Sequence, residues 1–122
     1  MKQCMIVDDS RIVRKVARRI LEGLDLDVTE ADDGATALEL CRKQMPDAIL
    51  LDGHAVTVVP SEFVRALRRE DGGAKPVVVL CTMETDVALI TEAVTAGAND
   101  YLLKPYDQEA LRAKLTEIGL LP

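Results

Sequence analysis

The sequence is poor in aromatic residues, histidine and cysteine. Its 122 residues include two tyrosines, one phenylalanine and no tryptophan, so its core must be built from aliphatic side chains. The single histidine, His54, excludes a metal centre with several histidine ligands. The three cysteines are odd in number and lack CxxC spacing, so neither a disulfide framework nor a zinc site is indicated. Cys4 and Cys81 lie inside apolar runs, where we expect buried free thiols.

Long apolar runs and an excess of positive charge are also missing. No stretch approaches the length of a membrane span, and the first residues do not form a signal peptide. The net charge of −6 argues against bulk binding to nucleic acid or to an anionic membrane. Neither glycine fingerprint of nucleotide-binding enzymes occurs, and there is no G-x-S-x-G elbow. We expect a cytoplasmic protein without membrane insertion.

Short apolar runs, rich in β-branched residues, alternate with helical patterns along the chain. The runs lack strict alternation of apolar and polar residues, which is typical of parallel strands that are covered on both faces. They lie at residues 6–7, 48–51, 77–81 and 101–103, with a weaker one at 26–31. The pattern predicts five β-α units, hence one doubly wound α/β domain over residues 1–122 with no output domain.

Apolar residues at helical spacing mark five helices between these runs. The predicted ends are Gly23, Pro46, Gly97 and Gly119, with a shorter helix around residues 63–67. The apolar stripes are Ile12, Val13, Val16, Ala17, Ile20 and Leu21; Ala37, Leu38, Cys41 and Met45; Phe63, Val64 and Leu67; Val87, Ile90, Ala93 and Val94; and Leu111, Leu115 and Ile118.

Four of the apolar runs end in a polar group with its own chemistry. These groups are Asp8 with Asp9, Asp52, Thr82 and Lys104. Because the carboxyl ends of parallel strands meet at one edge of a sheet, and ligands of open α/β sheets bind there, we expect the five side chains to converge. Three carboxylates, a hydroxyl and an ammonium predict a site for a hard cation and a phosphoryl group.

Each residue has a chemical reason to be there and an alternative structural one. Asp8 and Asp9 are like charges that a magnesium ion or Lys104 would stabilise; the structural alternative is that they cap the following helix. Asp52 ends an apolar strand, and a carboxylate can attack phosphorus if a metal and hydrogen-bond donors offset the charge. Thr82 alternatively caps a helix beginning at Glu84, and Lys104 is alternatively a solvated lysine.

Three segments carry a resemblance to a known family. With "MIVDDSRIVRKVARRIL", "PDAILLD" and "PVVVLCTMETDVALITEAVTAGANDYLLKPYDQEAL", the whole chain resembles the receiver domain of two-component response regulators, in particular the single-domain chemotaxis type. The resemblance implies a flavodoxin-like (βα)5 three-layer sandwich with a five-stranded parallel sheet in the order 2-1-3-4-5.

The resemblance also implies a role for each site residue. Asp52 would accept a phosphoryl group, and Thr82 and Lys104 would contact its oxygens. The implied Mg²⁺ ligands are Asp8, Asp9, Asp52 and the backbone carbonyl of His54. Tyr101 matches the aromatic residue of the switch, and the Lys104–Pro105 bond matches one that is cis in the family.

The implied function is a phosphorylation switch. A histidine kinase or histidine phosphotransfer protein would donate the phosphoryl group, and a protein target would bind over the last two helices and strand. The chain would act as a monomer or weak dimer, not as a conventional enzyme, with autophosphorylation and autodephosphorylation left open. No nucleic-acid partner is expected.

The loop after Asp52 departs from the family. Residues 53–60 lack the usual Met-Pro pair, and Pro60 stands where a glycine ends the family's loop. Proline cannot adopt the positive φ that glycine allows, so Pro60 instead predicts the first turn of the third helix. The altered loop motivates an alternative: a receiver-like adaptor that binds proteins without phosphorylation. A dehalogenase-type phosphatase is disfavoured, because its second acid is replaced by His54 and no cap insertion exists.

Three further features leave alternatives open. The valines of the loop, at positions 56, 58 and 59, either fold onto the core or form an exposed docking patch. His54 is hypothesised to tune water attack on a phosphoaspartate, with a lifetime that depends on pH near neutrality. The first helix carries a basic stripe that is either solvated or docks an acidic partner: Arg11, Arg14, Lys15, Arg18 and Arg19.

Overall fold

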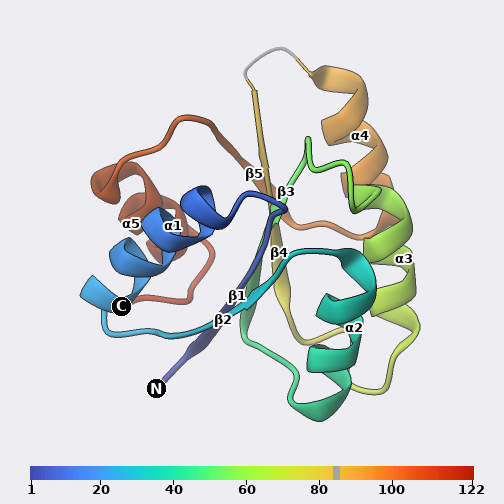
Figure 1. The fold of residues 1–122 in the computed structure, drawn as a ribbon, viewed down its shortest axis with the longest axis horizontal. Helices are drawn as coiled ribbons and strands as arrows, with labels where there is room; N and C mark the ends of the chain where they lie inside the picture. The colour runs from blue at the N-terminus through green and yellow to red at the C-terminus, as the bar shows by residue number, and fades with distance from the viewer. Residues whose placement is uncertain (84–85) are drawn as a thin grey trace.

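A five-stranded parallel sheet runs through the centre of the protein (Figure 1). The computed structural model describes residues 1–83 and 86–122. In this part of the chain the strand order is β2-β1-β3-β4-β5, which confirms the expected topology. The strands are β1 (Gln3–Val7), β2 (Asp27–Ala31), β3 (Ala48–Asp52), β4 (Val77–Thr82) and β5 (Asp100–Leu103).

Helices cover both faces of this sheet. Figure 1 shows α1 and α5 on one face and α2, α3 and α4 on the other. The helices are α1 (Arg11–Gly23), α2 (Gly34–Lys43), α3 (Pro60–Arg69), α4 (Val87–Ala96) and α5 (Gln108–Glu117). The result is the predicted three-layer sandwich, and no helix in the described ranges has the length and apolar character needed to cross a membrane.

The two hydrophobic cores follow from the alternation of side chains along each strand. In β1, Met5 and Val7 face the core under α2, α3 and α4, whereas Cys4 and Ile6 face the core under α1 and α5. Every residue of β3 is buried, because this central strand has helices on both faces. The cysteines at positions 4, 41 and 81 are free and buried, as predicted for the first and third.

Several predicted element ends differ from the structure, and three of them have a visible cause or consequence. β2 begins at Asp27 and not at residue 26. Leu26 precedes the strand and is buried in the core under α1 and α5. α2 ends at Lys43, before the predicted stop at Pro46. The cap of α4 is Asp86, whose side chain accepts from the backbone N–H of Leu89, so Thr82 does not cap this helix. Residues 84 and 85, where the prediction placed its start, lie outside the described residues.

Two of the predicted apolar stripes are only partly buried. In α1, Ala17 and Leu21 enter the core, but Ile12 and Val16 are 76% and 58% exposed. In α4, Ala93 is buried, whereas the valines at positions 87 and 94 are exposed. Helical spacing identifies the helices correctly, but it overestimates how wide a face each one buries.

The loop between β3 and α3 divides its valines between core and solvent. Pro60 occupies the first turn of α3, as predicted from the fixed φ of proline. Val58 packs into the core beside Gly34 and Phe63. Val56 and Val59 are exposed, so the core interpretation holds for one of the three valines.

Substitutions at two apolar positions test the assignment of the core. Leu115 of α5 is fully buried, so Leu115→Ala should lower the free energy of unfolding by about 2–5 kcal/mol. Val87 of α4 is 70% exposed, so Val87→Ala should change it by no more than about 0.5 kcal/mol. Urea denaturation of the two variants and the wild type measures both effects. Equal losses would contradict the difference in burial between Leu115 and Val87.

Candidate functional site at the carboxyl edge of the sheet

Three carboxylates converge where β1 and β3 end. Asp8 follows β1, Asp52 is the last residue of β3, and oxygen atoms of Asp8, Asp9 and Asp52 lie within 4.8 Å of one another. Asp8 and Asp52 are buried, whereas Asp9 is exposed. Neither Asp8 nor Asp9 caps α1. The cap is Ser10, whose hydroxyl accepts from the backbone N–H of Val13 at 3.2 Å. The helix-cap alternative therefore fails for this pair.

Lys104 bridges the two buried carboxylates. Its Nζ donates to Asp52 Oδ1 at 2.9 Å and to Asp8 Oδ2 at 3.3 Å. The backbone N–H of Lys104 donates to the carbonyl of Thr82 at 2.8 Å, which ties the end of β5 to the end of β4. The alternative of a solvated lysine is wrong, since this ammonium is held inside the acidic cluster.

Burial and charge shift the pKa values of this cluster. Burial raises the pKa of Asp8 above its ordinary value, and the nearby charge of Asp52 adds to this, although the Ser10 N–H and Lys104 oppose it. Burial acts in the opposite sense on Lys104, but the hydrogen bond and charge of Asp52, with those of Asp8, outweigh it and raise the pKa of Lys104. Lys104 is therefore cationic at neutral pH and partly offsets the acids.

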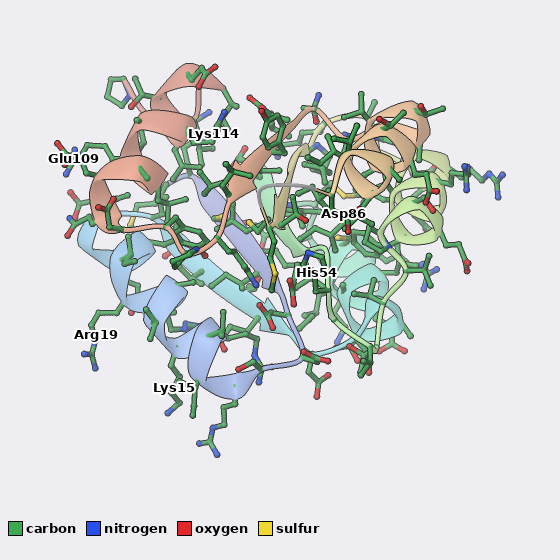
Figure 2. The ribbon with its side chains drawn as sticks, turned by 90° about the horizontal axis from the view of Figure 1, so that it is seen from above. Lys15, Arg19, His54, Asp86, Glu109 and Lys114 are labelled. Atoms are coloured by element: carbon green, nitrogen blue, oxygen red, sulfur yellow. The ribbon has the colours of Figure 1, made fainter. Side chains whose placement is uncertain are left out.

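Thr82 ends β4 with its hydroxyl held by the histidine. Its side chain is fully buried, and Thr82 Oγ1 lies 2.8 Å from His54 Nε2. The backbone N–H of Met83 also points at this nitrogen, at 3.3 Å. The backbone N–H of His54 donates to Asp52 Oδ1 at 3.1 Å, so the loop contacts the carboxylate as well. Figure 2 shows His54 among the side chains at this edge.

The altered loop is tied to its surroundings on both sides. The N–H of Gly53 donates to the Cys81 carbonyl at 2.8 Å, and a Cβ there would lie 2.8 Å from Leu89 Cδ2. A side chain at position 53 would therefore require Leu89 to shift, and its Cβ would lie 3.2 Å from the Cys81 carbonyl oxygen. Further along, the backbone N–H of Val56 donates to Asp9 Oδ2 at 3.0 Å. The backbone of the loop is thus hydrogen-bonded both to the end of β4 and to the acidic cluster.

Tyr101 lies on the outer side of β5. The residue is 42% exposed, and Lys114 Nζ is 5.8 Å from the ring centroid. Lys114 also pairs with Asp100 at 3.2 Å and Glu117 at 3.3 Å. These contacts hold the lysine over the ring. The Lys104–Pro105 bond is cis, the isomer that the resemblance implies.

Two arginines of the basic stripe make contacts that could not be read from the sequence. Arg14 donates to the backbone carbonyl of Asp8 at 2.7 Å and pairs with Glu30 at 3.1 Å. Arg18 pairs with the same glutamate at 2.8 Å. These two arginines are anchored to the end of β1 and to β2, whereas Lys15 and Arg19 point outward from α1 in Figure 2. In the sequence, the one hint of these ion pairs is an acidic residue, Glu30, within the predicted strand at 26–31.

Comparison with known proteins identifies the class to which this fold and site belong. The family model for the response regulator receiver domain matches residues 4–116. The chemotaxis protein CheY of Pseudomonas aeruginosa is 31% identical over 115 residues, which cover 93% of this chain and 93% of that protein. The structure of the chemotaxis response regulator CheY4 of Vibrio cholerae superposes with a TM-score of 0.89, at 29% identity, over 97% of this chain and 98% of that one.

Larger relatives share the same domain. The response regulator MprA of Mycobacterium sp. (strain KMS) is 38% identical over 111 residues, which cover 91% of this chain but only 47% of that protein. The chain thus spans about half the length of this relative. It belongs to the response regulator receiver family of two-component signalling, and its similarity is to chemotaxis-type receivers.

Asp8→Asn should stabilise the protein at neutral pH without added metal. The raised pKa of Asp8 means that folding favours its protonated form, so its stabilising contribution is present below its ordinary pKa of 3.8 and is lost as the pH rises through the raised value. Asparagine mimics the neutral form, so the gain at pH 7 should reach up to about 2 kcal/mol and shrink towards pH 4. Denaturant unfolding at several pH values measures it.

Asp27→Asn provides the matched control in an exposed position. This variant should change the free energy of unfolding by no more than about 0.5 kcal/mol across the same pH range. If Asp8→Asn proved less stable than the wild type at pH 7, the unfavourable burial of this charge would be refuted.

Proposed function

We propose that the protein accepts a phosphoryl group on Asp52 and thereby switches a protein-binding surface. The observation that carries this proposal is the position of Lys104, whose ammonium contacts the Asp52 carboxylate within a cluster of three acids. This arrangement leaves a nucleophilic carboxylate beside a fixed positive charge, which is what phosphoryl transfer to an aspartate requires.

The acidic cluster suits Mg²⁺. Magnesium prefers hard oxygen ligands and commonly uses one or two carboxylates together with phosphate oxygens. The donor set fits this preference, because three carboxylates lie within 4.8 Å of one another and one of them is exposed. Asp8, Asp9 and Asp52 would hold the ion, with the carbonyl of His54 as a further ligand. When bound, Mg²⁺ would neutralise charge on the phosphoryl oxygens.

The residues of the chain divide the remaining work. A carboxylate oxygen of Asp52 attacks phosphorus as the bond from phosphorus to the donor's leaving group breaks. Lys104 would then donate to one phosphoryl oxygen and the Thr82 hydroxyl to another, because these oxygens are acceptors only. Asp52 is buried, and this burial would limit the access of water to an acyl phosphate formed on it.

The proposed output is a change at the surface formed by α4, β5 and α5. Movement of Thr82 towards the phosphoryl group would let Tyr101 turn inward from its 42% exposed position. A histidine kinase or histidine phosphotransfer protein is the proposed donor, and a protein target binds this surface. The proposal includes a cytoplasmic, monomeric or weakly dimeric protein that does not bind nucleic acid. Its acidic net charge of −6 is consistent with the last point.

Phosphorylation by a small acyl phosphate tests the proposal without a cognate kinase. Acetyl phosphate with Mg²⁺ should place one acid-stable, base-labile phosphoryl group on Asp52, as located by mass spectrometry. Omission of Mg²⁺ should lower the yield by at least about tenfold, since several kcal/mol of charge stabilisation would be lost.

Two variants control this experiment. Asp52→Asn should abolish labelling, whereas Asp71→Asn, on the exposed turn after α3, should leave it unchanged. An unlabelled wild type, tested with Mg²⁺ and folded as judged by circular dichroism, would favour the adaptor alternative. Labelling at a residue other than Asp52 would contradict the proposed acceptor.

A further inference from the structure

The hydroxyl of Thr82 makes a hydrogen bond to His54. It is fully buried, and His54 Nε2, at 2.8 Å, is its side-chain partner among the residues that the structure describes. A threonine hydroxyl has a single hydrogen, so it can serve as donor to one strong acceptor at a time.

The neighbouring backbone assigns the direction of this hydrogen bond. The N–H of Met83 points at the same Nε2 at 3.3 Å, and a backbone N–H can only donate. Nε2 is therefore an acceptor, the imidazole carries its proton on Nδ1, and the Thr82 hydroxyl donates to Nε2. The only hydrogen that Thr82 has to offer to a phosphoryl oxygen is already in use.

We infer that His54 is a positioning residue that holds the Thr82 hydroxyl in its resting place and competes with the phosphoryl group for its hydrogen. Every accepted phosphoryl group must then break the His54–Thr82 hydrogen bond before Thr82 can donate to it. The side chain of His54 thus sets part of the free-energy difference between the resting and phosphorylated states. This inference rests on the proposed function.

The effect of the His54 side chain on Thr82 can be separated from the contacts that the loop backbone makes with the acidic cluster. The contacts of His54 with the carboxylate and with the implied metal use its backbone N–H and carbonyl, which any residue retains. The imidazole contacts Thr82 and the Met83 N–H. His54→Leu therefore removes the competing acceptor but keeps the backbone N–H and carbonyl of residue 54.

Binding of beryllofluoride, a mimic of the phosphoryl group, tests the competition at equilibrium in the presence of Mg²⁺. His54→Leu should bind it about two- to tenfold more tightly than the wild type, the range that corresponds to one net hydrogen bond. In a Thr82→Val background, where no hydroxyl is contested, His54→Leu should have no effect on affinity. Val59→Ala, an exposed position in the same loop, serves as the matched control and should bind like the wild type.

A second measurement examines the hydrogen bond in the free protein. The ¹⁵N resonances of the His54 ring should show a proton on Nδ1 and an acceptor at Nε2, and the Nε2 resonance should shift in Thr82→Val. This measurement tests whether the hydrogen bond exists, whereas the beryllofluoride affinities test whether it competes with the phosphoryl group. A proton on Nε2, or equal or weaker beryllofluoride binding by His54→Leu, would overturn the inference alone. Failure of the wild type to bind beryllofluoride would overturn the proposed function and this inference with it.

Discussion

The ion pair between Lys104 and the buried acids is the interaction on which the rest of the site depends. Asp8 and Asp52 stand at the ends of adjacent parallel strands, where their charges would repel each other in a partly dry environment. The ammonium of Lys104, reaching across from the end of β5, contacts both. This pairing offsets the cost of burying two carboxylates, which would be unfavourable at an apolar sheet edge without a counter-charge.

This ion pair is possible because of the order of the strands. β1 and β4 both flank β3, and β5 lies beyond β4, so chain segments separated by 52 residues meet at Asp52 and Lys104. The backbone hydrogen bond from Lys104 to Thr82 fixes the register between the ends of β5 and β4. A one-residue slip of β5 would turn the lysine to the opposite face of the sheet. Function therefore depends on register as much as on residue type.

Much of this arrangement was predictable from the sequence, because apolar runs that end in polar groups define both the strands and their active edge. The five site residues and the strand order required only this pattern together with the family resemblance. The extent of each helix's buried face did not follow, since Ile12 and Val16 have the spacing of core residues but lie outside it. Contacts between side chains were also out of reach. Nothing in the sequence pairs His54 with Thr82, because that contact depends on how the loop folds past Cys81.

Under the proposed function, the same contacts would link the unusual loop to regulation. The backbone of the loop contacts Asp52 and Asp9, and its histidine contacts Thr82, so the loop is part of the site. Metal, phosphoryl group and loop would therefore share the same few polar atoms. This sharing gives a physical reason for a resting state that is stabilised by the chain itself and released only when stronger ligands compete for those atoms.

A titration with Mg²⁺, followed through backbone amide resonances, tests the central claim most directly: that acids distant in sequence form one cation site at the edge of the sheet. Such a site should give saturable shifts concentrated in residues 8–10, 52–56 and 82–83, and these shifts should weaken strongly in Asp52→Asn. Shifts scattered over exposed acids elsewhere, or no saturable response in these three segments, would contradict it.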